Sequence, residues 1–383
     1  MPFFQLNSSR SASVRLKFLS ILVFAFIPAF AQAQWKVLNI GTTIHMRAVH
    51  AVTPTICWAG GTKGTVLKTT NGGKTWLTYK VPGADSLDFR DIHAFDKHVA
   101  IAMSAGESEK DKAKIYRTED GGESWSLVYQ TTQSGVFLDG IDFWDKSRGI
   151  CLGDPTDQRL FVLTTSDGGK SWLELPAAQR PQGESGEACF AASGTSILAF
   201  GRGNAFIGTG GSKMARVFRS DDYGQSWKVS ATPLPAGPTS GIFGLRFWSK
   251  KNGMAVGGDY KRTTDSTRNV LITRDGGVSW ELAGITKPTG LKEAVSLYHK
   301  TDAVWNGETE VRADDYALVA SGPSGSSVSL DHGKTWRLLG KEGFHALSFA
   351  GNVGYGVGAN GLIGKIEKIS MKKKTRKLAI IKQ

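Results

Sequence analysis

The chain has 383 residues, 40% of them hydrophobic, and its 47 Lys and Arg outnumber 34 Asp and Glu to give a formal net charge of +13. The hydrophobic content excludes a wholly disordered chain, and the length allows two domains or one large all-β unit. Three cysteines are too few, and odd in number, for a disulfide scaffold. The 47 glycines and 11 tryptophans predict many tight turns, each with an aromatic side chain to pack beside it.

The first 33 residues have the pattern of a secretory signal. Arg10, Arg15 and Lys17 precede a thirteen-residue apolar stretch at 18–30, and Ala31-Gln32-Ala33 fits a small-x-small cleavage site. The apolar stretch is shorter than the ~20 residues that a membrane-spanning helix needs. We therefore expect a signal peptide at residues 1–33, cleavage after Ala33, and an exported protein that is periplasmic or secreted.

An octapeptide pattern, Ser/Thr-x-Asp-x-Gly-x-Ser/Thr-Trp, recurs after the signal. Its six copies are TTNGGKTW (69–76), TEDGGESW (118–125), TSDGGKSW (165–172), SDDYGQSW (220–227), TRDGGVSW (273–280) and SLDHGKTW (329–336). The copies repeat at intervals of 47 to 56 residues, a period typical of propellers and solenoids. In each copy the Asp or Asn side chain can accept hydrogen bonds from turn amides, and Gly supplies a left-handed conformation. The Trp then opens the next strand.

Short alternating segments around the octapeptides predict four strands in each repeat. Third strands lead into the octapeptides at 65–68, 114–117, 216–219 and 269–272, and Gly-ended second strands lie at 58–61, 151–154, 255–259 and 356–360. Seven inner strands are predicted at 48–52, 91–95, 140–144, 188–192, 244–248, 294–298 and 346–350. The Gly-rich stretch 201–213 is expected to connect the second and third strands of the fourth repeat. Four strands in each unit of about fifty residues describe a propeller blade.

Seven inner strands against six octapeptides leave one blade without an outer strand. Gln34-Trp35-Lys36-Val37 resembles Ser226-Trp227-Lys228-Val229, which begins an outer strand. We therefore expect Trp35 to open the outer strand of the last blade, whose other strands come from 344–369, because this sharing removes an open sheet edge. The predicted fold is a single all-β, seven-bladed β-propeller at residues 34–369. The alternative is six blades with two unpaired flanks.

The octapeptide is similar to the Asp box, or bacterial neuraminidase repeat, which also occurs in sialidases, xyloglucanases and sortilin-type receptors. A single propeller behind an export signal resembles the photosystem II stability/assembly factor family over residues 35–368. This resemblance implies a seven-bladed propeller that binds membrane-protein partners without catalysis, with its boxes on the face opposite the binding mouth. The residues expected to have this structural role are Asn71, Asp120, Asp167, Asp222, Asp275, Asp331, Trp76, Trp125, Trp172, Trp227, Trp280 and Trp336.

The loops that enter each inner strand and leave each second strand form the mouth of the central channel, and we call this side the mouth face. Loops on a rigid scaffold commonly carry function, so a binding site is expected here. Alignment of the inner strands gives one equivalent entry position, occupied by Arg47, Arg90, Asp139, Glu187, Phe243, Glu293 and His345. The loops after the second strands add Glu107, Asp154, Arg202 and Asp259. The alternative for each of these residues is an ordinary solvated loop charge.

We favour a non-enzymatic propeller that binds a protein partner, as an assembly or stability factor for an envelope or membrane complex. The alternative is a glycan-active hydrolase of the sialidase or Asp-box glycosidase type. A sialidase needs three converging arginines and a tyrosine nucleophile, whereas other glycosidases need two carboxylates ~5–9.5 Å apart. The candidates for such chemistry are Arg47, Arg90, Arg246, Asp139, Asp154, Glu187 and Tyr260.

The other signals point to no cofactor. The sequence has no HExxH or Cys/His metal spacing, so no metal is expected. Buried free thiols are expected at Cys57, Cys151 and Cys189, with a Cys151–Cys189 bond as the alternative. The signal carries three of the excess positive charges and the tail at 370–383 carries six, which leaves +4 on the body. This tail is either a solvated end or a contact for an anionic surface, and it is too short for specific nucleic-acid readout. We expect a monomer.

Overall fold

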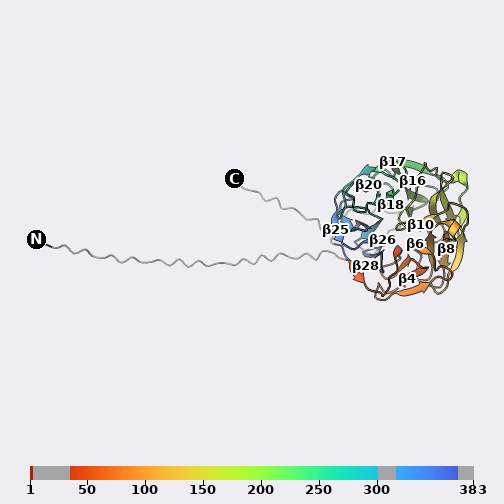
Figure 1. Ribbon diagram of the computed structural model, residues 1–383, viewed down its shortest axis with the longest axis horizontal. Helices are drawn as coiled ribbons and strands as arrows, with labels where there is room; N and C mark the ends of the chain where they lie inside the picture. Colours follow the sequence, from red (N-terminus) through yellow and green to blue (C-terminus); the bar gives the residue numbers. More distant parts are fainter. Residues whose placement is uncertain (3–34, 301–315, 370–383) are drawn as a thin grey trace. The chain divides into compact units, whose positions relative to one another are not determined.

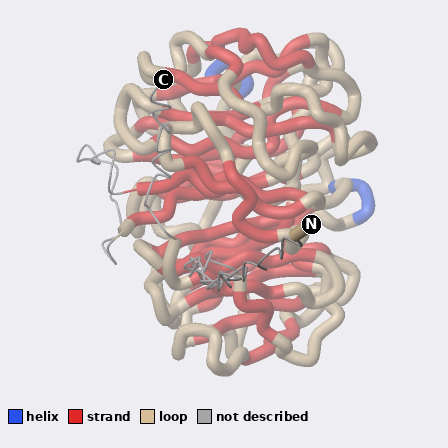
Figure 2. The backbone as a smooth tube through the Cα atoms, turned by 90° about the vertical axis from the view of Figure 1, so that its left-hand side faces the viewer, coloured by secondary structure: helices blue, strands red, loops and turns tan. Residues whose placement is uncertain are grey.

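The computed structural model describes residues 1–2, 35–300 and 316–369. The predicted signal from residue 3 onward, its cleavage site after Ala33, and the basic tail at 370–383 lie outside the described residues. Within the described ranges no helix is long and apolar enough to cross a membrane. Apart from two 3₁₀ turns, η1 (Ser108–Lys110) and η2 (Ala177–Gln179), the regular structure there is β-strand, as Figure 2 shows.

The strands form seven antiparallel sheets of four, so the predicted seven-bladed propeller is confirmed. Blades one to four comprise β2 (Met46–Ala51), β3 (Cys57–Gly61), β4 (Thr65–Thr69) and β5 (Leu77–Lys80); β6 (Asp88–Ala94), β7 (Ala100–Ala105), β8 (Lys114–Thr118) and β9 (Ser126–Gln130); β10 (Leu138–Phe143), β11 (Gly149–Thr156), β12 (Arg159–Thr165) and β13 (Leu173–Glu174); and β14 (Ile197–Phe200), β15 (Asn204–Gly208), β16 (Met214–Ser220) and β17 (Lys228–Pro235). Blades five to seven comprise β18 (Ser240–Phe247), β19 (Gly253–Asp259), β20 (Val270–Thr273) and β21 (Glu281–Leu282); β22 (Ala294–His299), β23 (Tyr316–Gly322), β24 (Gly325–Ser329) and β25 (Arg337–Gly340); and β26 (Phe344–Ala350), β27 (Val353–Gly358), β28 (Ile363–Ile366) and β1 (Lys36–Leu38).

The inner strands of the blades surround the centre of the propeller. Figure 1 shows β6, β10, β18 and β26 toward this centre and β4, β8, β17, β25 and β28 toward the rim. Every residue of β3 and β4 is buried, because a middle strand of a blade is covered on both faces by the neighbouring blades. Apolar side chains fill these spaces: Trp58 of blade one packs in one cluster with Phe89 and Ile92 of blade two.

The N-terminal strand closes the ring as predicted. Strand β1 pairs with β28, with Lys36 opposite Lys365 and Leu38 opposite Ile363. The preceding Trp35 is buried, its indole Nε1–H donates to Ser326 Oγ at 2.8 Å, and its ring lies 4.8 Å from the ring of Phe344. The two ends of the described propeller are therefore tied together within one sheet, and β1 covers the edge of β28 that would otherwise be open.

The octapeptide turns bond within themselves. In the second turn the Ser124 N–H and hydroxyl donate to the two oxygens of Asp120, at 2.9 and 2.5 Å. In the first turn Asn71 keeps the bond from the Thr75 N–H (3.0 Å) but donates its own Nδ2–H to the Thr75 hydroxyl (2.8 Å). Asn is therefore accommodated because the hydroxyl can act as donor or acceptor. We call the face that carries these turns the box face.

Neighbouring inner strands are joined by polar side chains that accept hydrogen bonds from the next blade. Without these acceptors the inner edges of the strands would bury unpaired amides. The four bonds run from the Ala51 N–H to Ser348 Oγ, from the Ala94 N–H to His50 Nδ1, from the Ile141 N–H to Asp91 Oδ2, and from the Ala199 N–H to Asp142 Oδ2, at 2.7 to 2.9 Å.

The predicted inner strand of the fourth blade was wrong. Strand β14 at Ile197–Phe200 occupies the innermost position, whereas residues 188–192 form no strand and share only an isolated bridge between Ala188 and Gly210. The stretch 201–213 contains the second strand, β15, rather than only a connection. Both 188–192 and 197–200 are apolar, so alternation alone could not choose between them. The first segment is instead buried across the channel mouth.

Candidate functional site at the channel mouth

Five inner strands share a β-bulge at the position that the sequence aligned. The register shifts between Met46 and Ala48, and the equivalent shifts in β6, β10, β18 and β26 fall at the same place. The five bulged residues are Arg47, Arg90, Asp139, Phe243 and His345. A bulge turns its side chain away from the regular pleat. Five blades therefore present one side chain each at the start of their inner strands, and Glu293 stands immediately before β22 of the sixth blade.

Residues 188–196, which we call the plug segment, lie across the channel mouth. The segment bonds to residues of five other blades, which surround the channel. The contacts are Arg47 Nη1 to Ala192 O (3.2 Å), Arg90 Nη1 to Ala191 O (3.3 Å), the Cys189 N–H to Asp154 Oδ1 (2.8 Å), the Leu245 N–H to Thr195 O (2.9 Å) and Ser193 Oγ to Glu293 O (2.7 Å). A segment that reaches all these blades must cover the channel at this end.

Arg47, Glu293 and His345 form one ionic network beside the plug segment. Arg47 Nη1 lies 3.2 Å from Glu293 Oε1, and His345 Nδ1 lies 2.6 Å from Glu293 Oε2. Burial by itself would raise the pKa of Glu293, but the hydrogen bond and charge of His345 and the charge of Arg47 outweigh it, so this pKa is lowered. Glu293 is therefore a buried carboxylate whose charge is already balanced.

The three arginines proposed for a sialidase site do not share one open point. Arg47 and Arg90 both donate to plug carbonyls, and Arg90 Nε also donates to Asp88 Oδ2 at 2.8 Å. Arg246 is buried elsewhere in the channel, where burial lowers its pKa and the charge of Asp142 raises it. The plug segment thus occupies the positions that a substrate carboxylate would need at the first two guanidinium groups.

Of the proposed carboxylates, buried Asp139 lies close to half-buried Asp154, and Glu187 forms a separate ion pair with Arg216. Asp139 is 1% exposed, and burial followed by the charge of Asp154 raises its pKa well above the usual range. Burial also raises the pKa of Asp154, to about 6. Glu187 is buried away from the bulge positions, where it accepts from Arg216 Nε at 3.0 Å and from the Thr209 hydroxyl at 2.5 Å.

Of three further predicted mouth residues, one lies elsewhere and two are paired locally. Arg202 precedes the second strand of the fourth blade, β15, instead of following it. It therefore lies in the turn between β14 and β15, on the box face. Asp259 ends β19 at the mouth face and accepts from the Thr239 hydroxyl (2.8 Å) and Arg262 Nε (3.0 Å). Glu107 pairs with Lys110 at 2.5 Å across η1.

An aromatic group at the mouth was not anticipated from the sequence. The ring of Phe190, in the plug segment, stacks on bulged Phe243 with centroids 4.1 Å apart and planes at 7°. Tyr260 lies against the edge of this pair, with its ring 6.3 Å from Phe190, and is 44% exposed. Phe190 precedes Phe243 by 53 residues and Tyr260 by 70 residues, so no local pattern could have joined it to them.

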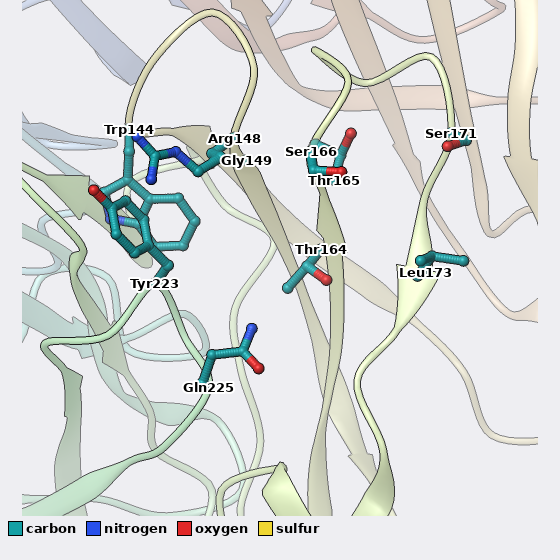
Figure 3. A pocket seen from close by; sticks show the side chains of 10 residues that line it. All are labelled: Trp144, Arg148, Gly149, Thr164, Thr165, Ser166, Ser171, Leu173, Tyr223 and Gln225. Carbon is teal, nitrogen blue, oxygen red and sulfur yellow. The ribbon is translucent and has the colours of Figure 1, made fainter.

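A cavity of about 160 Å³ lies on the box face between blades three and four. Figure 3 shows Trp144, Tyr223 and Arg148 together on one side of it, and Arg148 stacks on Tyr223 with its guanidinium 4.1 Å from the ring centre. Tyr223 replaces the first glycine of the octapeptide and has a left-handed φ of 62°. The ten residues lining this cavity, all in the described part of the chain, include no carboxylate or histidine, so they supply no acid–base pair.

The three cysteines are free and buried in the structure, at Cys57, Cys151 and Cys189. Burial raises the pKa of each thiol well above its ordinary value. The Cys189 sulfur nevertheless has two acidic neighbours, because one ligand atom each of Asp139, Asp154 and Cys189 lie within 4.8 Å of one another.

No protein-family model matches the sequence. The chloroplastic photosystem II stability/assembly factor HCF136 of Oryza sativa subsp. japonica is 29% identical over 112 residues, which are 29% of this chain and 25% of that protein. The photosystem II assembly lipoprotein Ycf48 of Synechococcus sp. (strain CC9902) is 25% identical over 239 residues, which are 61% of this chain and 59% of that protein. The chain thus matches a quarter of the first relative and under two thirds of the second.

A solved structure, YCF48 bound to D1 peptide, matches the fold with a TM-score of 0.61 at 14% identity, over 90% of this chain and 99% of that chain. At this identity the match establishes the seven-bladed propeller and nothing about its ligand. Together with the two sequence relatives, it confirms the predicted resemblance to photosystem II stability/assembly factors.

Proposed function

We propose that the chain is an exported, non-enzymatic propeller that binds a protein partner at its mouth face, as an assembly or stability factor for an envelope or membrane complex. The observation that carries this proposal is the exposure of Tyr260. It is the only aromatic side chain that is exposed in the described part of the chain. It also has a packed support, because its ring lies edge-on against Phe190, which is stacked on Phe243. Exposed tyrosines on rigid supports are typical centres of protein interfaces.

The loop that carries Tyr260 is cationic, which favours an acidic partner segment. Residues 260–268 contain Lys261, Arg262 and Arg268 against the single acid Asp265. Arg262 keeps a side-chain exposure of 70% although it pairs with Asp259 at 3.0 Å. Complementary charge steers a partner toward the loop, and the aromatic group then supplies the buried contact.

The geometry around the plug segment favours binding over hydrolysis. Hydrolysis of a glycosidic bond needs two carboxyl groups facing the substrate from an open cleft. Asp139 is buried, Glu187 is paired with Arg216, and Arg47 and Arg90 are bonded to the plug segment. A substrate would have to displace the plug segment before it met these groups.

The relatives support the same class of function. Two are photosystem II assembly or stability factors by name, and a structure of similar fold holds a D1 peptide. We carry over only the class, a protein partner of a membrane complex. Because the sequence matches cover parts of the relatives, the identity of the partner is left to experiment.

Site-specific photocrosslinking tests where the partner binds. A photoreactive phenylalanine analogue replaces Tyr260 on the mouth face or, as the matched control, Val278 on the box face of the same blade, where it is 51% exposed. We expect a crosslinked envelope or membrane polypeptide from position 260 and none from position 278. Equal crosslinking from both positions, or crosslinking from 278 alone, would contradict binding at the mouth face.

The hydrolase alternative has a direct assay. The purified protein is incubated with aryl sialosides and aryl glycosides, and release of the aryl group is measured. We expect no turnover above buffer. Turnover that disappears in Arg90→Ala or Asp154→Asn would show an enzyme and overturn the non-enzymatic proposal.

We also propose that residues 1–33 direct export, that the body is monomeric, and that the tail at 370–383 contacts anionic surfaces. The basic n-region and cleavage pattern support the first of these, and six cations without an acid support the last. N-terminal sequencing of the exported protein tests the cleavage, with Gln34 as the expected first residue. Light scattering of the purified protein tests the monomer, and a dimer mass would contradict it.

A further inference from the structure

We propose that Asp139, Asp154 and Cys189 form a buried binding site for one divalent cation of the Zn²⁺ type, which joins the plug segment to blade three. Asp139 is the bulged residue of β10, Asp154 lies in β11 of the same blade, and Cys189 lies in the plug segment. This inference is independent of the function proposed above, because it concerns the inner side of the plug segment rather than its exposed surface.

The three side chains lie close to the spacing of a metal centre. One ligand atom from each lies within 4.8 Å of the others. Zn²⁺ binds oxygen at about 2.0–2.2 Å and thiolate at about 2.3 Å, so an oxygen and a sulfur on one ion are at most about 4.5 Å apart. Small side-chain rotations therefore bring all three onto one ion, and water can complete a four-coordinate site.

One oxygen of Asp139 has no hydrogen-bond partner in the described part of the chain, which indicates that a ligand is needed there. Asp139 Oδ2 is buried and has no hydrogen-bond partner among the described residues, although buried polar atoms are almost always bonded. The Ala191 and Asp154 amides lie near enough to the carboxylate to lower its pKa, although the Asp154 N–H also donates to Phe137 O at 2.9 Å. A carboxylate oriented by backbone amides, with one oxygen left over, has the arrangement of a metal ligand held by its outer shell.

Asp154 is held in the same manner. Its Oδ1 accepts from the Cys189 N–H at 2.8 Å, and this bond places the Cys189 side chain beside the two carboxylates. The backbone of the plug segment thus brings the sulfur to the acids before any ion binds. Such preorganisation lowers the cost of forming a site.

The charge and ligand types select the ion. When an ion binds, the two carboxyl groups and the thiol give up their protons, and the resulting two carboxylates and thiolate carry more negative charge than the nearby Arg90 can balance, while Glu187 is already paired with Arg216. A divalent cation would supply the missing positive charge. Thiolate is a poor ligand for Mg²⁺ and Ca²⁺ but suits Zn²⁺, Co²⁺ and Cd²⁺, so the site should prefer the latter group.

The site lacks the sequence spacing of common zinc motifs. Asp139 and Asp154 are 15 residues apart and Cys189 follows 35 residues later. Only the crossing of the plug segment over the mouth brings the sulfur to blade three. An ion here would act as a structural staple, since it would connect a strandless segment to a blade.

The test uses the mature protein treated with a chelator and then titrated with Zn²⁺ by calorimetry and with Co²⁺ by absorption spectroscopy. We expect one ion per chain and a thiolate-to-cobalt charge-transfer band. Cys189→Ser should abolish that band and weaken Zn²⁺ binding by at least roughly 10–100-fold, and Asp139→Asn should weaken Zn²⁺ binding similarly. Cys57→Ser, which changes a buried thiol in blade one, should leave both the band and the stoichiometry unchanged.

Circular dichroism first establishes that each variant is folded. If Cys189→Ser does not fold, cadmium NMR of the wild-type protein supplies the answer, because its chemical shift distinguishes one thiolate with oxygen ligands from oxygen ligands alone. Absence of stoichiometric binding by the wild-type protein would overturn the site. So would binding that Cys189→Ser leaves intact. A wild-type protein that binds no ion, and that Asp139→Asn stabilises, would show instead that the two carboxyl groups share a proton.

Discussion

His50 shows how a single side chain supports the inner ring of strands. Its Nδ1 accepts the Ala94 N–H at 2.9 Å, and its ring packs edge-on against His93 at 4.4 Å. Burial, and then the charge of His93, lower its pKa to about 3, while Asp142 acts in the opposite direction and Arg246 adds to the lowering. The ring is therefore neutral in the folded protein, and protonation would remove the acceptor that blade two needs.

This lowered pKa predicts a loss of stability in mild acid. Below its ordinary pKa of 6.5 the unfolded chain takes up a proton on His50 that the folded protein does not accept until about pH 3. The contribution of His50 to the free energy of unfolding is therefore fully present above pH 6.5. Below pH 6.5 this free energy falls by up to about 1.4 kcal/mol per pH unit. Urea unfolding at pH 7 and pH 5 measures this change in the free energy of unfolding.

Two variants isolate the effect of His50. His50→Gln keeps an oxygen that can accept from the Ala94 N–H, so it should reduce the difference between pH 7 and pH 5. His98→Gln changes an exposed histidine and should leave that difference as it is in the wild type. An unchanged pH difference in His50→Gln would show that protonation of His50 does not control acid stability.

The octapeptide aspartates give a prediction at lower pH. Bonds from Ser171 and neighbouring groups lower the pKa of Asp167 to about 2, although burial acts in the opposite direction. The stability that ionised Asp167 gives to the folded protein is therefore present above the ordinary pKa of about 3.9, and it is lost as the pH falls toward 2. Asp167→Ala should cost about 0.5–1.5 kcal/mol at pH 7, because the exposed amides of Lys170 and Ser171 exchange this acceptor for water.

Asn71 shows which substitution the same turn tolerates. At pH 7 the stability of Asp167→Asn should be closer to that of the wild type than the stability of Asp167→Ala. The reason is that Asn71 makes an equivalent set of bonds in the first turn. Thermal unfolding of the two variants at pH 7 compares them. Equal losses would mean that the carboxylate charge, and not the side-chain oxygen, supports the turn.

Among the structural elements, β1 has a role out of proportion to its three residues. Two of the three residues of β1 are exposed and one is half-buried, so their side chains bury little surface against the propeller. The buried ring of Trp35 and its bond to Ser326 therefore attach the N-terminal strand. Trp35→Ala should lower the free energy of unfolding by about 3–5 kcal/mol, because a large aromatic side chain leaves the space between β25 and β26. Urea unfolding measures the loss.

Val37→Ala is the matched control in the same strand. Val37 is 52% exposed, and its truncation should change stability by less than about 0.5 kcal/mol. Hydrogen exchange should also be faster in β28 of the Trp35→Ala protein than in β12 of blade three, whose side chains belong to other core clusters than those of the closure. Wild-type stability in Trp35→Ala would contradict closure by the N-terminal strand.

Blade four shows how far prediction from the sequence reaches at this scale. The octapeptides predicted the turns, and the resemblance of residues 34–37 to residues 226–229 predicted the closure of the ring by the N-terminal strand. Both are local patterns with one structural solution. The inner strand was misplaced because two apolar segments compete for it and only packing decides. Gly194, with φ of 75°, lies so close to Asp91 that an added Cβ would be 2.1 Å from its Oδ1, and this tight bend directs the plug segment across the mouth.

Consequences for the whole molecule follow from the plug segment. The sequence aligned the mouth charges at one entry position of the inner strands as a candidate binding site, whereas in the structure the plug segment bonds to Arg47 and Arg90, and Asp139 is buried. Neither the Phe190–Phe243–Tyr260 group nor the approach of Cys189 to two carboxylates could be predicted, because each depends on a crossing between distant blades. The net charge of +13 likewise resolves into a near-neutral body with basic ends.

The most direct measurement is the affinity of the partner segment, identified by crosslinking from position 260, for three forms of the purified propeller. Tyr260→Ala should weaken binding by roughly 10- to 100-fold, as expected for an interface centre worth about 1.5–3 kcal/mol. Val278→Ala on the box face should bind like the wild type. Equal affinity of Tyr260→Ala and the wild type, or weaker binding only in Val278→Ala, would contradict a partner-binding mouth face.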